Sequence, residues 1–477
     1  MDRNVELFLQ AEKQYRLFDL PFAGENLWDY VRLETFRLIE RQLLRSNLVP
    51  VPYRQVFFDD GICYSDAQKE AYENHLIDSL KGCQVLIVNN KHRFVMLDGK
   101  QFCPITGMIE SILDTQIGYC TQVYDRGSFR CYDSDNDINY NRIRKTPRLL
   151  FAEEELDAYV LKLGTIFDSV YAISLEEPFY RDVKAQVRYV ADIMGYMDFY
   201  RRVLIQVRPK CLILSSYYAT VDSLMIAEAK QLGIATIEVQ HGTIGNEHVA
   251  YNCLEQRYDR PGMPDYLAAY GLFDREVPRN FVPPHRVILT GNLFLEHIRR
   301  RLDLDNPAKN GNKTNKTVLI VSFNMKNEPL VNFAVELKEK CPDWKVIYRF
   351  HPEEKIIDKN RRWMLDAGVQ CQDDFRVSIY NLIAESDYVV GTKSTVLYES
   401  MCFGKPSYIL RTESHERDWR EAERHMQHVD DAESFLRTIR SVDSGTEFRR
   451  RSAYFYQTGG ADNFRALVDR IMEGDKT

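Results

Sequence analysis

Residues 210–239 read KCLILSSYYATVDSLMIAEAKQLGIATIEV and contain a strand, a helix and a second strand in succession. The apolar runs at 210–216 and 234–239 are short and nearly uninterrupted, which is typical of strands buried on both faces of a sheet. Between them, residues 221–233 carry apolar side chains at helical spacing, and Gly233 stands where a helix ends. This order predicts two neighbouring parallel strands joined by a crossover helix.

The same alternation continues along the chain in both directions. We expect further strands at residues 84–88, 265–271, 286–292, 317–323, 344–350, 387–391 and 406–410. We expect helices at 5–45, with an interruption near Pro21–Glu25, and at 152–207, 328–340, 377–386 and 394–404. Residues 100–145 are polar and irregular, and we expect a surface insertion there. Residues 415–475 look helical, and we expect them to cross back to the first domain.

Residues 303–316, DLDNPAKNGNKTNK, have the composition of a linker between domains. We therefore predict an α/β protein with two Rossmann-like domains that face each other across a cleft. The first domain covers residues 1–302 and the second covers residues 317–477. Ligands of such sheets bind outside the carboxyl ends of the strands, so the residues that follow each strand are the candidates for function.

The composition excludes several classes of protein. The chain has 477 residues and a formal net charge of -7, so we expect no nucleic-acid partner. No apolar run approaches the ~18 residues that span a bilayer, and the first residues lack the apolar core of a signal peptide. The ten cysteines form no CxxC pair, which favours reduced thiols in a cytoplasmic protein over a disulfide framework or a zinc site.

Three short groups of arginines interrupt the otherwise acidic sequence. They are Arg299–Arg301, Arg449–Arg451, and Arg37, Arg41 and Arg45 at helical spacing. Solvated helix faces are the default interpretation. A patch that contacts anionic lipid is the alternative left open.

Two histidines and a glutamate follow the strand at 234–239. His241 lies between Gln240 and Gly242, and Glu247 and His248 follow closely. Together these groups can act as a general base, a general acid or metal ligands. A hydrogen-bonded structural histidine at a turn is the alternative, and the clustering at a strand end favours function.

A third candidate histidine follows the strand at 344–350. Pro352 keeps His351 in an extended conformation at the strand end. Arg349 is two residues earlier, so it shares a strand face with His351. An imidazole at this edge could donate to a phosphate oxygen. A simple strand-ending turn is the alternative.

Hydroxyl side chains follow the strand at 387–391. Lys393, Ser394 and Thr395 lead into a helix that contains Glu399. Free N–H groups and hydroxyls at a helix N-terminus make an anion site, and Thr395 and Glu399 are spaced to share one helix face. An ordinary N-cap is the alternative for Ser394.

Several familiar motifs are missing from the sequence. It has no GxxxxGK[ST] phosphate loop, no GxGxxG after a strand, no HExxH and no GxSxG. We interpret the acidic run DSDND (133–137) as a solvated loop, with a divalent-ion site as the lesser alternative.

Residues 205–410 resemble GT-B glycosyltransferases of bacterial capsule and lipopolysaccharide assembly. The resemblance is carried by His351-Pro352, by Ser394, Thr395 and Glu399, and by Gly404-Lys405-Pro406. It includes CMP-sugar transferases for Kdo and sialic acid, and teichoic-acid polyol-phosphate transferases have similar His and Ser/Thr sites. Residues 238–251, with Gln240-His241-Gly242, resemble a segment of capsular polysaccharide biosynthesis proteins.

The resemblance implies an inverting, metal-independent transferase. Its donor would be a nucleotide-sugar substrate, with a CMP-sugar favoured and no cofactor, and its acceptor an oligosaccharide or a lipid-linked chain at the inner face of the cytoplasmic membrane. The second domain would bind the donor through Arg349, His351, Lys393, Ser394, Thr395 and Glu399. The first domain would bind the acceptor and supply the base from His241, Glu247 or His248.

Three alternatives stay open beside this interpretation. A CDP-polyol phosphotransferase and a sugar-nucleotide epimerase could use the same fold. An inactive GT-B subunit that only supports an assembly complex is the non-enzymatic alternative.

Overall fold

The computed structural model divides into two compact units. Unit 1 comprises Met1–Ala269, Glu276–Ile288 and Asp462–Thr477, and unit 2 comprises Tyr270–Arg275 and Leu289–Ala461. The structure describes residues 3–43, 62–90, 95–97, 100–122, 137–246, 248–258, 260–276, 282–302, 315–323, 327–351, 354, 358–374, 377–392, 394–412, 426–441 and 444–474.

Unit 1 is built on a seven-stranded sheet in the order β5-β4-β1-β6-β7-β8-β9. Parallel pairing joins β1 to β4 and β6, β4 to β5, β6 to β7 and β7 to β8. The order reverses between β1 and β6, which makes their carboxyl ends a topological switch point. The strands are β1 (Val85–Asn90), β4 (Ile117–Gln122), β5 (Asp137–Ile138), β6 (Cys211–Leu214), β7 (Ala235–Val239), β8 (Tyr266–Ala269) and β9 (Val287–Leu289).

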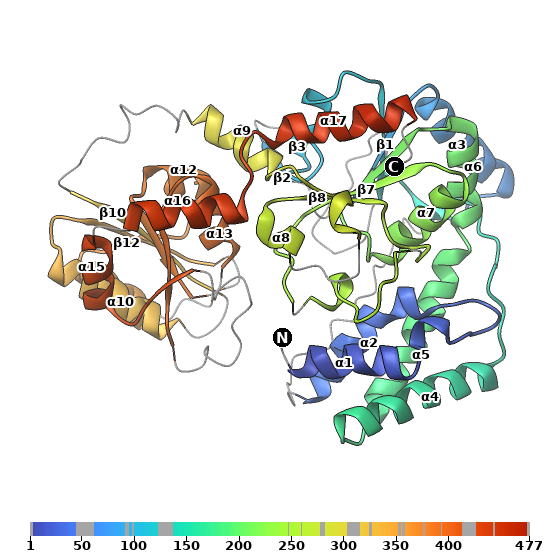
Figure 1. Ribbon diagram of the computed structural model, residues 1–477, viewed down its shortest axis with the longest axis horizontal. Helices are drawn as coiled ribbons and strands as arrows, with labels where there is room; N and C mark the ends of the chain where they lie inside the picture. The colour runs from blue at the N-terminus through green and yellow to red at the C-terminus, as the bar shows by residue number, and fades with distance from the viewer. Residues whose placement is uncertain are drawn as a thin grey trace. The chain divides into compact units, whose positions relative to one another are not determined.

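The helices of unit 1 cover this sheet and add a separate helical layer. In that layer α1, α2, α4 and α5 share one apolar core (Figure 1), in which the rings of Phe8 and Phe167 stack with centroids 5.3 Å apart. The helices are α1 (Arg3–Gln14), α2 (Trp28–Leu43), α3 (Asp66–Leu80), α4 (Glu153–Tyr171), α5 (Glu177–Met194), α6 (Met197–Val207), α7 (Thr220–Gln231) and the C-terminal α17 (Gly460–Glu473). A short hairpin of β2 (Val95–Leu97) and β3 (Lys100–Phe102) stands apart from the main sheet.

Unit 2 is built on a six-stranded sheet in the order β12-β11-β10-β13-β14-β15, with parallel pairing between all neighbours. Numbered within the unit, this is the 3-2-1-4-5-6 order of the doubly wound Rossmann fold. Its switch point lies between β10 and β13. The strands are β10 (Thr317–Val321), β11 (Lys345–Arg349), β12 (Gln370–Gln372), β13 (Tyr388–Gly391), β14 (Ser407–Leu410) and β15 (Gln427–Val429).

Helices pack on both faces of the unit 2 sheet (Figure 1). The core on one face includes residues of α10, α11 and α15, while α12 contacts β10 and α13 contacts β13 and β14. Gly404 follows α13 with a φ of +69°, a left-handed conformation that costs a residue with a Cβ more than it costs glycine. The helices are α8 (Leu272–Glu276), α9 (Leu293–Arg301), α10 (Glu328–Lys340), α11 (Asp358–Asp366), α12 (Ile379–Glu385), α13 (Thr395–Cys402), α15 (Ala432–Arg440) and α16 (Ser444–Phe455).

These features confirm the prediction of an α/β protein with two Rossmann-like domains. The surface insertion expected at residues 100–145 is wrong, because β4 lies inside that range and pairs with β1 in the main sheet. The expected crossing of the C-terminal segment is found in α17, since residues from Asp462 onward belong to unit 1.

The linker expected at 303–316 lies outside the described residues except for its last two positions. The compact units differ from the expected domains in three assignments. Tyr270–Arg275 and the residues from Leu289 onward, including α9, belong to unit 2, and Asp462–Thr477 belong to unit 1.

Candidate active site

The carboxyl ends of β10, β11 and β13 bring the candidate residues of unit 2 to one edge of its sheet. These strands are neighbours in the order β11-β10-β13. Ser322 follows β10, His351 lies just beyond β11, and Thr392 follows β13. The residues after β10 and β13 therefore flank the switch point, where doubly wound sheets bind their ligands.

A network of main-chain and side-chain bonds holds His351 in place. Its backbone N–H donates to Ser322 Oγ at 2.8 Å and to Glu354 Oε2 at 3.3 Å. The Ser322 hydroxyl itself donates to the Glu354 carboxylate. The half-buried imidazole lies beside the ring of Phe323, with centroids 6.2 Å apart. The network fixes the backbone at His351 and leaves the ring at the sheet edge.

Part of the Arg349 guanidinium holds the protein backbone. The side chain is buried, and it donates to the carbonyl oxygens of Asp374 at 2.8 Å and Val377 at 3.3 Å. Burial lowers the pKa of Arg349, and the charges of Asp374 and Asp373 oppose this effect. These bonds hold the chain that follows β12. The expected contact of Arg349 with the nucleotide-sugar must therefore come from guanidinium N–H groups that these two bonds do not use.

The start of α13 combines a helix cap with a paired hydroxyl and carboxyl. Ser394 Oγ accepts from Val396 N at 3.3 Å and is the N-cap residue. The exposed Thr395 forms a side-chain hydrogen bond with Glu399 one turn later, so the two do share a helix face. Burial raises the pKa of Glu399, and the bond from Thr395 lowers it. Lys393 lies outside the described residues.

In unit 1, Tyr218 connects the two candidate histidines beyond β7. Its hydroxyl lies 2.8 Å from His241 Nε2. The Tyr218 ring also lies beside His248, with centroids 5.3 Å apart, and His248 packs edge-on against Tyr251 at 4.8 Å. Both imidazoles are half-buried, while Glu247 lies outside the described residues.

A buried carboxyl group lies beneath this aromatic cluster. Glu238 in β7 is fully buried, and its Oε1 accepts from the Tyr251 hydroxyl at 2.7 Å and from Tyr217 N at 3.2 Å. Burial and the charge of Glu238 raise the pKa of Tyr251 well above its ordinary value. Tyr251 therefore remains a neutral phenol that links the buried carboxyl to His248.

The segment that carries His248 is braced from two sides. Asn252 Nδ2 donates to the carbonyl oxygens of Gly245 at 3.0 Å and His248 at 2.9 Å. Arg32 in α2 donates to the carbonyls of Val249 at 2.8 Å and Asn252 at 3.0 Å.

The Arg32 brace depends on a buried ion pair. Arg32 Nε lies 2.6 Å from Glu12 Oε1 in α1, and both side chains are almost fully buried. Burial opposes the charge of Arg32, but Glu12 outweighs it, so the pKa of Arg32 stands above its ordinary value. The helical layer of unit 1 thereby positions a loop of the candidate site.

A polar cluster at the switch point of unit 1 went unnoticed in the sequence. Asp222, fully buried in the first turn of α7, accepts from Gln122 Nε2 at 2.8 Å and from Asn90 Nδ2 at 3.3 Å. Asn90 ends β1 and Gln122 ends β4. The sequence signal for this cluster was a polar residue at the end of each of the two strands. It was missed because β4 was not recognised as a strand within the polar and irregular range 100–145.

The chain is therefore an α/β protein with two Rossmann-like sheets, and each sheet has polar groups at the carboxyl ends of its strands. No family model matches the sequence. No curated protein matches it at the level of sequence.

Among solved structures, the chain is similar to a UDP-GlcNAc 2-epimerase from Neisseria meningitidis bound to UDP-GlcNAc, at 14% identity and a TM-score of 0.45, covering 82% of this chain and 99% of the epimerase. It is similar to the wall teichoic acid polymerase TagF, at 10% identity and a TM-score of 0.44, covering 93% and 98% of the two chains. MurG of Acinetobacter baumannii is similar at 12% identity and a TM-score of 0.42, covering 81% and 99%. Function is therefore argued from the site alone.

Among the helices that the structure describes, none combines the length and the apolar character needed to cross a bilayer.

Proposed function

We propose that this chain is a glycosyltransferase that moves a sugar from a nucleotide-activated donor to a growing bacterial surface polysaccharide or lipid-linked acceptor. One observation supports the proposal most strongly. The switch point of unit 2 has His351 on one side and the N-terminus of α13, with Ser394, Thr395 and Glu399, on the other. A nucleotide's phosphate needs such hydrogen-bond donors, and its ribose is suited to a nearby carboxylate.

In this proposal unit 2 holds the donor. The N-terminus of α13, which carries partial positive charge, and the hydroxyls of Ser394 and Thr395 bind the donor phosphate. The Glu399 carboxylate accepts from a ribose hydroxyl. His351 donates a hydrogen bond to the phosphate as it leaves, which stabilises its growing negative charge without a metal ion. A CMP-sugar, with its single phosphate, is the favoured donor.

Unit 1 supplies the base in the same proposal. The acceptor hydroxyl attacks the anomeric carbon while the bond from that carbon to the phosphate oxygen breaks, and the nucleotide leaves with the electron pair. His241 takes the acceptor's proton, and Tyr218, 2.8 Å from its Nε2, orients the ring. Attack from the face opposite the leaving group inverts the anomeric configuration. His248 and Glu247 are the other candidates for this base.

Calorimetric titration with CMP, CDP, UDP and GDP, each with EDTA present, tests the proposal. Binding of CMP supports a CMP-sugar donor. Selective binding of CDP would favour a CDP-polyol phosphotransferase, in which a P–O bond breaks in place of the C–O bond. Binding of UDP with conversion of UDP-GlcNAc in the absence of an acceptor would favour an epimerase. No binding of any nucleotide would contradict donor binding and favour a supporting subunit.

We expect His351→Ala to weaken binding of the nucleotide about 10-fold or more, because a charge-assisted hydrogen bond contributes roughly 1.5–3 kcal/mol. His297→Ala is the matched control, since His297 is an exposed histidine of the same unit on α9. Equal affinity in the His351 variant and the control would remove His351 from the donor site.

We also propose a cytoplasmic location with a peripheral contact at the inner membrane face. Arg299–Arg301 form the last turn of α9. Arg300 pairs with Glu296 at 3.0 Å, and Arg37 and Arg41 both pair with Glu34, each at 3.4 Å, so part of the charge of each arginine group is neutralised. Co-sedimentation with anionic vesicles that salt abolishes would support the contact. A protein that stays in the supernatant at low salt would contradict it.

A further inference from the structure

The helix α7 begins at the switch point of unit 1. β6 is the first strand beyond the reversal in strand order, and α7 follows it from Thr220. In unit 2, α13 has the corresponding place, because it follows β13, the first strand beyond the reversal there. Ligands of doubly wound sheets bind at such edges. The start of α7 is therefore the position in unit 1 that corresponds to the proposed phosphate site of unit 2.

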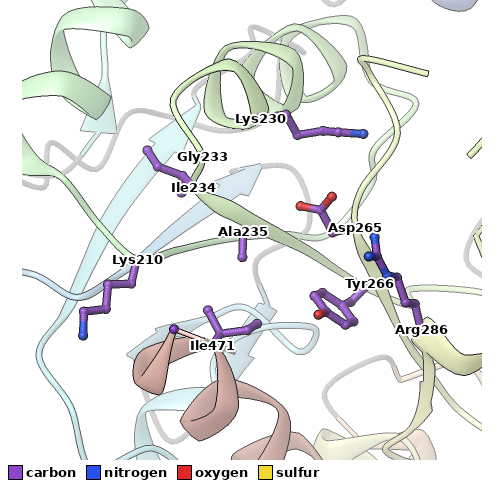
Figure 2. Close-up of a pocket in the computed structure, with 10 residues that line it drawn as sticks. Lys210, Lys230, Gly233, Ile234, Ala235, Asp265, Tyr266, Arg286 and Ile471 are labelled. Atoms are coloured by element: carbon purple, nitrogen blue, oxygen red, sulfur yellow. The ribbon is translucent and has the colours of Figure 1, made fainter. Parts of the chain in front are cut away.

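This position is at the opposite edge of the sheet from the cavity that Figure 2 shows. Ala235 and Tyr266, which line that cavity, are the first residues of β7 and β8. β6, β7 and β8 are parallel, so their first residues lie at one edge and the start of α7 lies at the other. The cavity is therefore no part of the site considered for α7.

The helices α7 and α13 begin differently. Ser394 caps α13, whereas the N-cap residue of α7 is Ala219, which has no side-chain oxygen and forms no side-chain cap. Ala219 is half-buried, so the start of α7 is accessible from the sheet edge. The first N–H groups of a helix have no partner within the helix. In α7, no N-cap side chain competes with a ligand for these groups.

Asn90 is a second, independent indication of a ligand. It ends β1 and is 1% exposed, and its Nδ2 donates at 3.3 Å to Oδ2 of Asp222 in the first turn of α7. This bond fixes the orientation of the amide, because an ionised carboxylate oxygen only accepts hydrogen bonds. Asn90 Oδ1 is buried and has no hydrogen-bond partner within the described part of the chain, and the same is true of Ser215 Oγ just beyond β6. A buried polar atom without a partner is costly, so a ligand that supplies one is favoured.

These groups select the chemical class of the ligand. The N–H groups at the start of α7 need a hydrogen-bond acceptor, while Asn90 Oδ1 needs a hydrogen-bond donor. The oxygens of an ionised phosphate or carboxylate accept but do not donate, and an ammonium group donates but does not accept. A hydroxyl group does both, and a neutral sugar carries several hydroxyl groups.

We propose that the start of α7 and Asn90 form a subsite for the hydroxyl groups of a neutral sugar in the acceptor substrate. The proposal rests on the proposed transfer reaction, because it takes unit 1 as the unit that binds the acceptor substrate. It deepens that reaction by naming the class of sugar and the residues that recognise it.

The position of the subsite also sets a minimum length for the acceptor substrate. β6 separates β1 from β7, so at ~4.8 Å between neighbouring strands the ends of β1 and β7 lie about 10 Å apart. His241 lies just beyond the end of β7. A sugar held at Asn90 is therefore a neighbour of the sugar that presents its hydroxyl to His241, and the acceptor substrate must contain at least two sugars.

The first experiment presents the full chain to an array of neutral and acidic oligosaccharides, from monosaccharides to tetrasaccharides. We expect binding to neutral disaccharides and longer neutral chains, weaker binding to their monosaccharides, and no displacement by inorganic phosphate. Binding to acidic sugars alone, binding to no sugar, or displacement by phosphate would overturn the proposal. Equal binding of a monosaccharide and its disaccharide would overturn the two-sugar minimum.

Ala219→Ser tests the subsite with a change that favours the fold. Serine is preferred at an N-cap, where its hydroxyl accepts from N–H groups of the first turn, so the midpoint of thermal unfolding should rise. The sugar loses these donors, so its affinity should fall about twofold to tenfold, as for the loss of one hydrogen bond. Calorimetry with the tightest oligosaccharide of the array measures this affinity. Ala152→Ser at the N-cap of α4, which also has no side-chain cap, is the matched control and should bind the sugar normally.

Titration of the nucleotide on the same samples separates this proposal from the transfer reaction. Neither variant should change the affinity for the nucleotide, because that site is assigned to unit 2. Sugar binding that responds to Ala219→Ser in a protein that binds no nucleotide would contradict the transfer reaction and support the sugar subsite. Nucleotide binding together with a sugar affinity that is equal in Ala219→Ser and Ala152→Ser would refute the subsite alone.

Discussion

The Glu399 carboxyl group is placed where its charge is costly. Tyr380 and Tyr456 lie close enough for its charge to affect them, and the hydroxyl of Thr395 is its hydrogen-bond partner. Burial raises the pKa of Glu399 above the ordinary 4.5, and the Thr395 bond only partly offsets this. The folded chain therefore binds this proton more tightly than the unfolded chain does. As the pH rises from the ordinary value through the raised value, the group's contribution to stability is lost.

Glu399→Gln should consequently be more stable than the wild type near neutral pH, and this advantage should disappear below pH 4.5, the ordinary carboxyl pKa. The size of the effect is about 1.4 kcal/mol for each unit of pKa shift that the substitution removes. Urea unfolding at the two pH values measures it. Thr395→Val should have the opposite effect. It removes the bond that lowers the pKa of Glu399, so it should reduce stability near neutral pH and widen the pH dependence of stability. A stability difference that is the same at both pH values would show that the Glu399 charge carries no cost in the fold.

Single residues at the candidate site differ in how far the sequence could identify them. His351 and Ser394 come within three residues of the ends of apolar strands, so their place at a sheet edge was predictable. Ser322, Glu354 and Tyr218 were not identified. Ser322 and Tyr218 act through hydrogen bonds to residues distant in the chain, and nothing in the local sequence marks Glu354. The N-cap at Ser394 was the alternative interpretation of that residue, and it is found together with the Thr395–Glu399 bond.

At the scale of elements, α1 and α2 act on the site through one buried ion pair. Arg32 and Glu12 neutralise each other inside the helical layer. The other N–H groups of Arg32 donate to carbonyl oxygens near His248. Removing one partner of such a pair leaves an uncompensated buried charge, whereas removing both does not.

Arg32→Met should therefore destabilise unit 1 by about 3–5 kcal/mol and speed hydrogen exchange in residues 243–252. The double variant Glu12→Leu with Arg32→Met should recover part of that stability but not the protection of the loop, since the carbonyls still lack their donor. Unfolding measurements on both single variants and the double variant complete the cycle. Purely additive losses would show that the pair is not coupled, and unchanged exchange would show that Arg32 does not brace the loop.

The elements most clearly predicted were the strands that are apolar throughout. β6 and the last four residues of β10 are apolar without interruption, as expected for strands that helices cover on both faces. β4 reads IGYCTQ, and its mixture of glycine, tyrosine, threonine and glutamine hid a strand that pairs with β1. Its polar end is needed for the bond from Gln122 to Asp222, so the same residue that serves the unit 1 cluster weakened the strand signal.

At the scale of the whole molecule, the chain does not divide at one point. It leaves unit 1 near Ile288, builds the doubly wound sheet of unit 2, and returns at Asp462. Composition alone indicated the polar segment 303–316, because it is rich in residues typical of loops. The short segments that join the two units have no such composition, so the sequence did not indicate them. The return of the chain to unit 1 was expected from the helical pattern of residues 415–475, but the position at which it begins was not.

The proposed reaction assigns different steps to the two units, and this division can be tested with two variants. His241→Asn lies in unit 1 and should leave the affinity for the donor nucleotide within about twofold of the wild type, because affinity depends on groups of unit 2. Its turnover should fall about 10²–10⁴-fold, the usual range for loss of a general base. His351→Ala should reduce both affinity and turnover. Titration of the nucleotide and assay of sugar transfer measure the two quantities on the same samples. If His241→Asn keeps its turnover while His248→Asn loses it, the base is His248. If both variants remain active, neither histidine of unit 1 is the base, and the chemistry must be sought with Glu247.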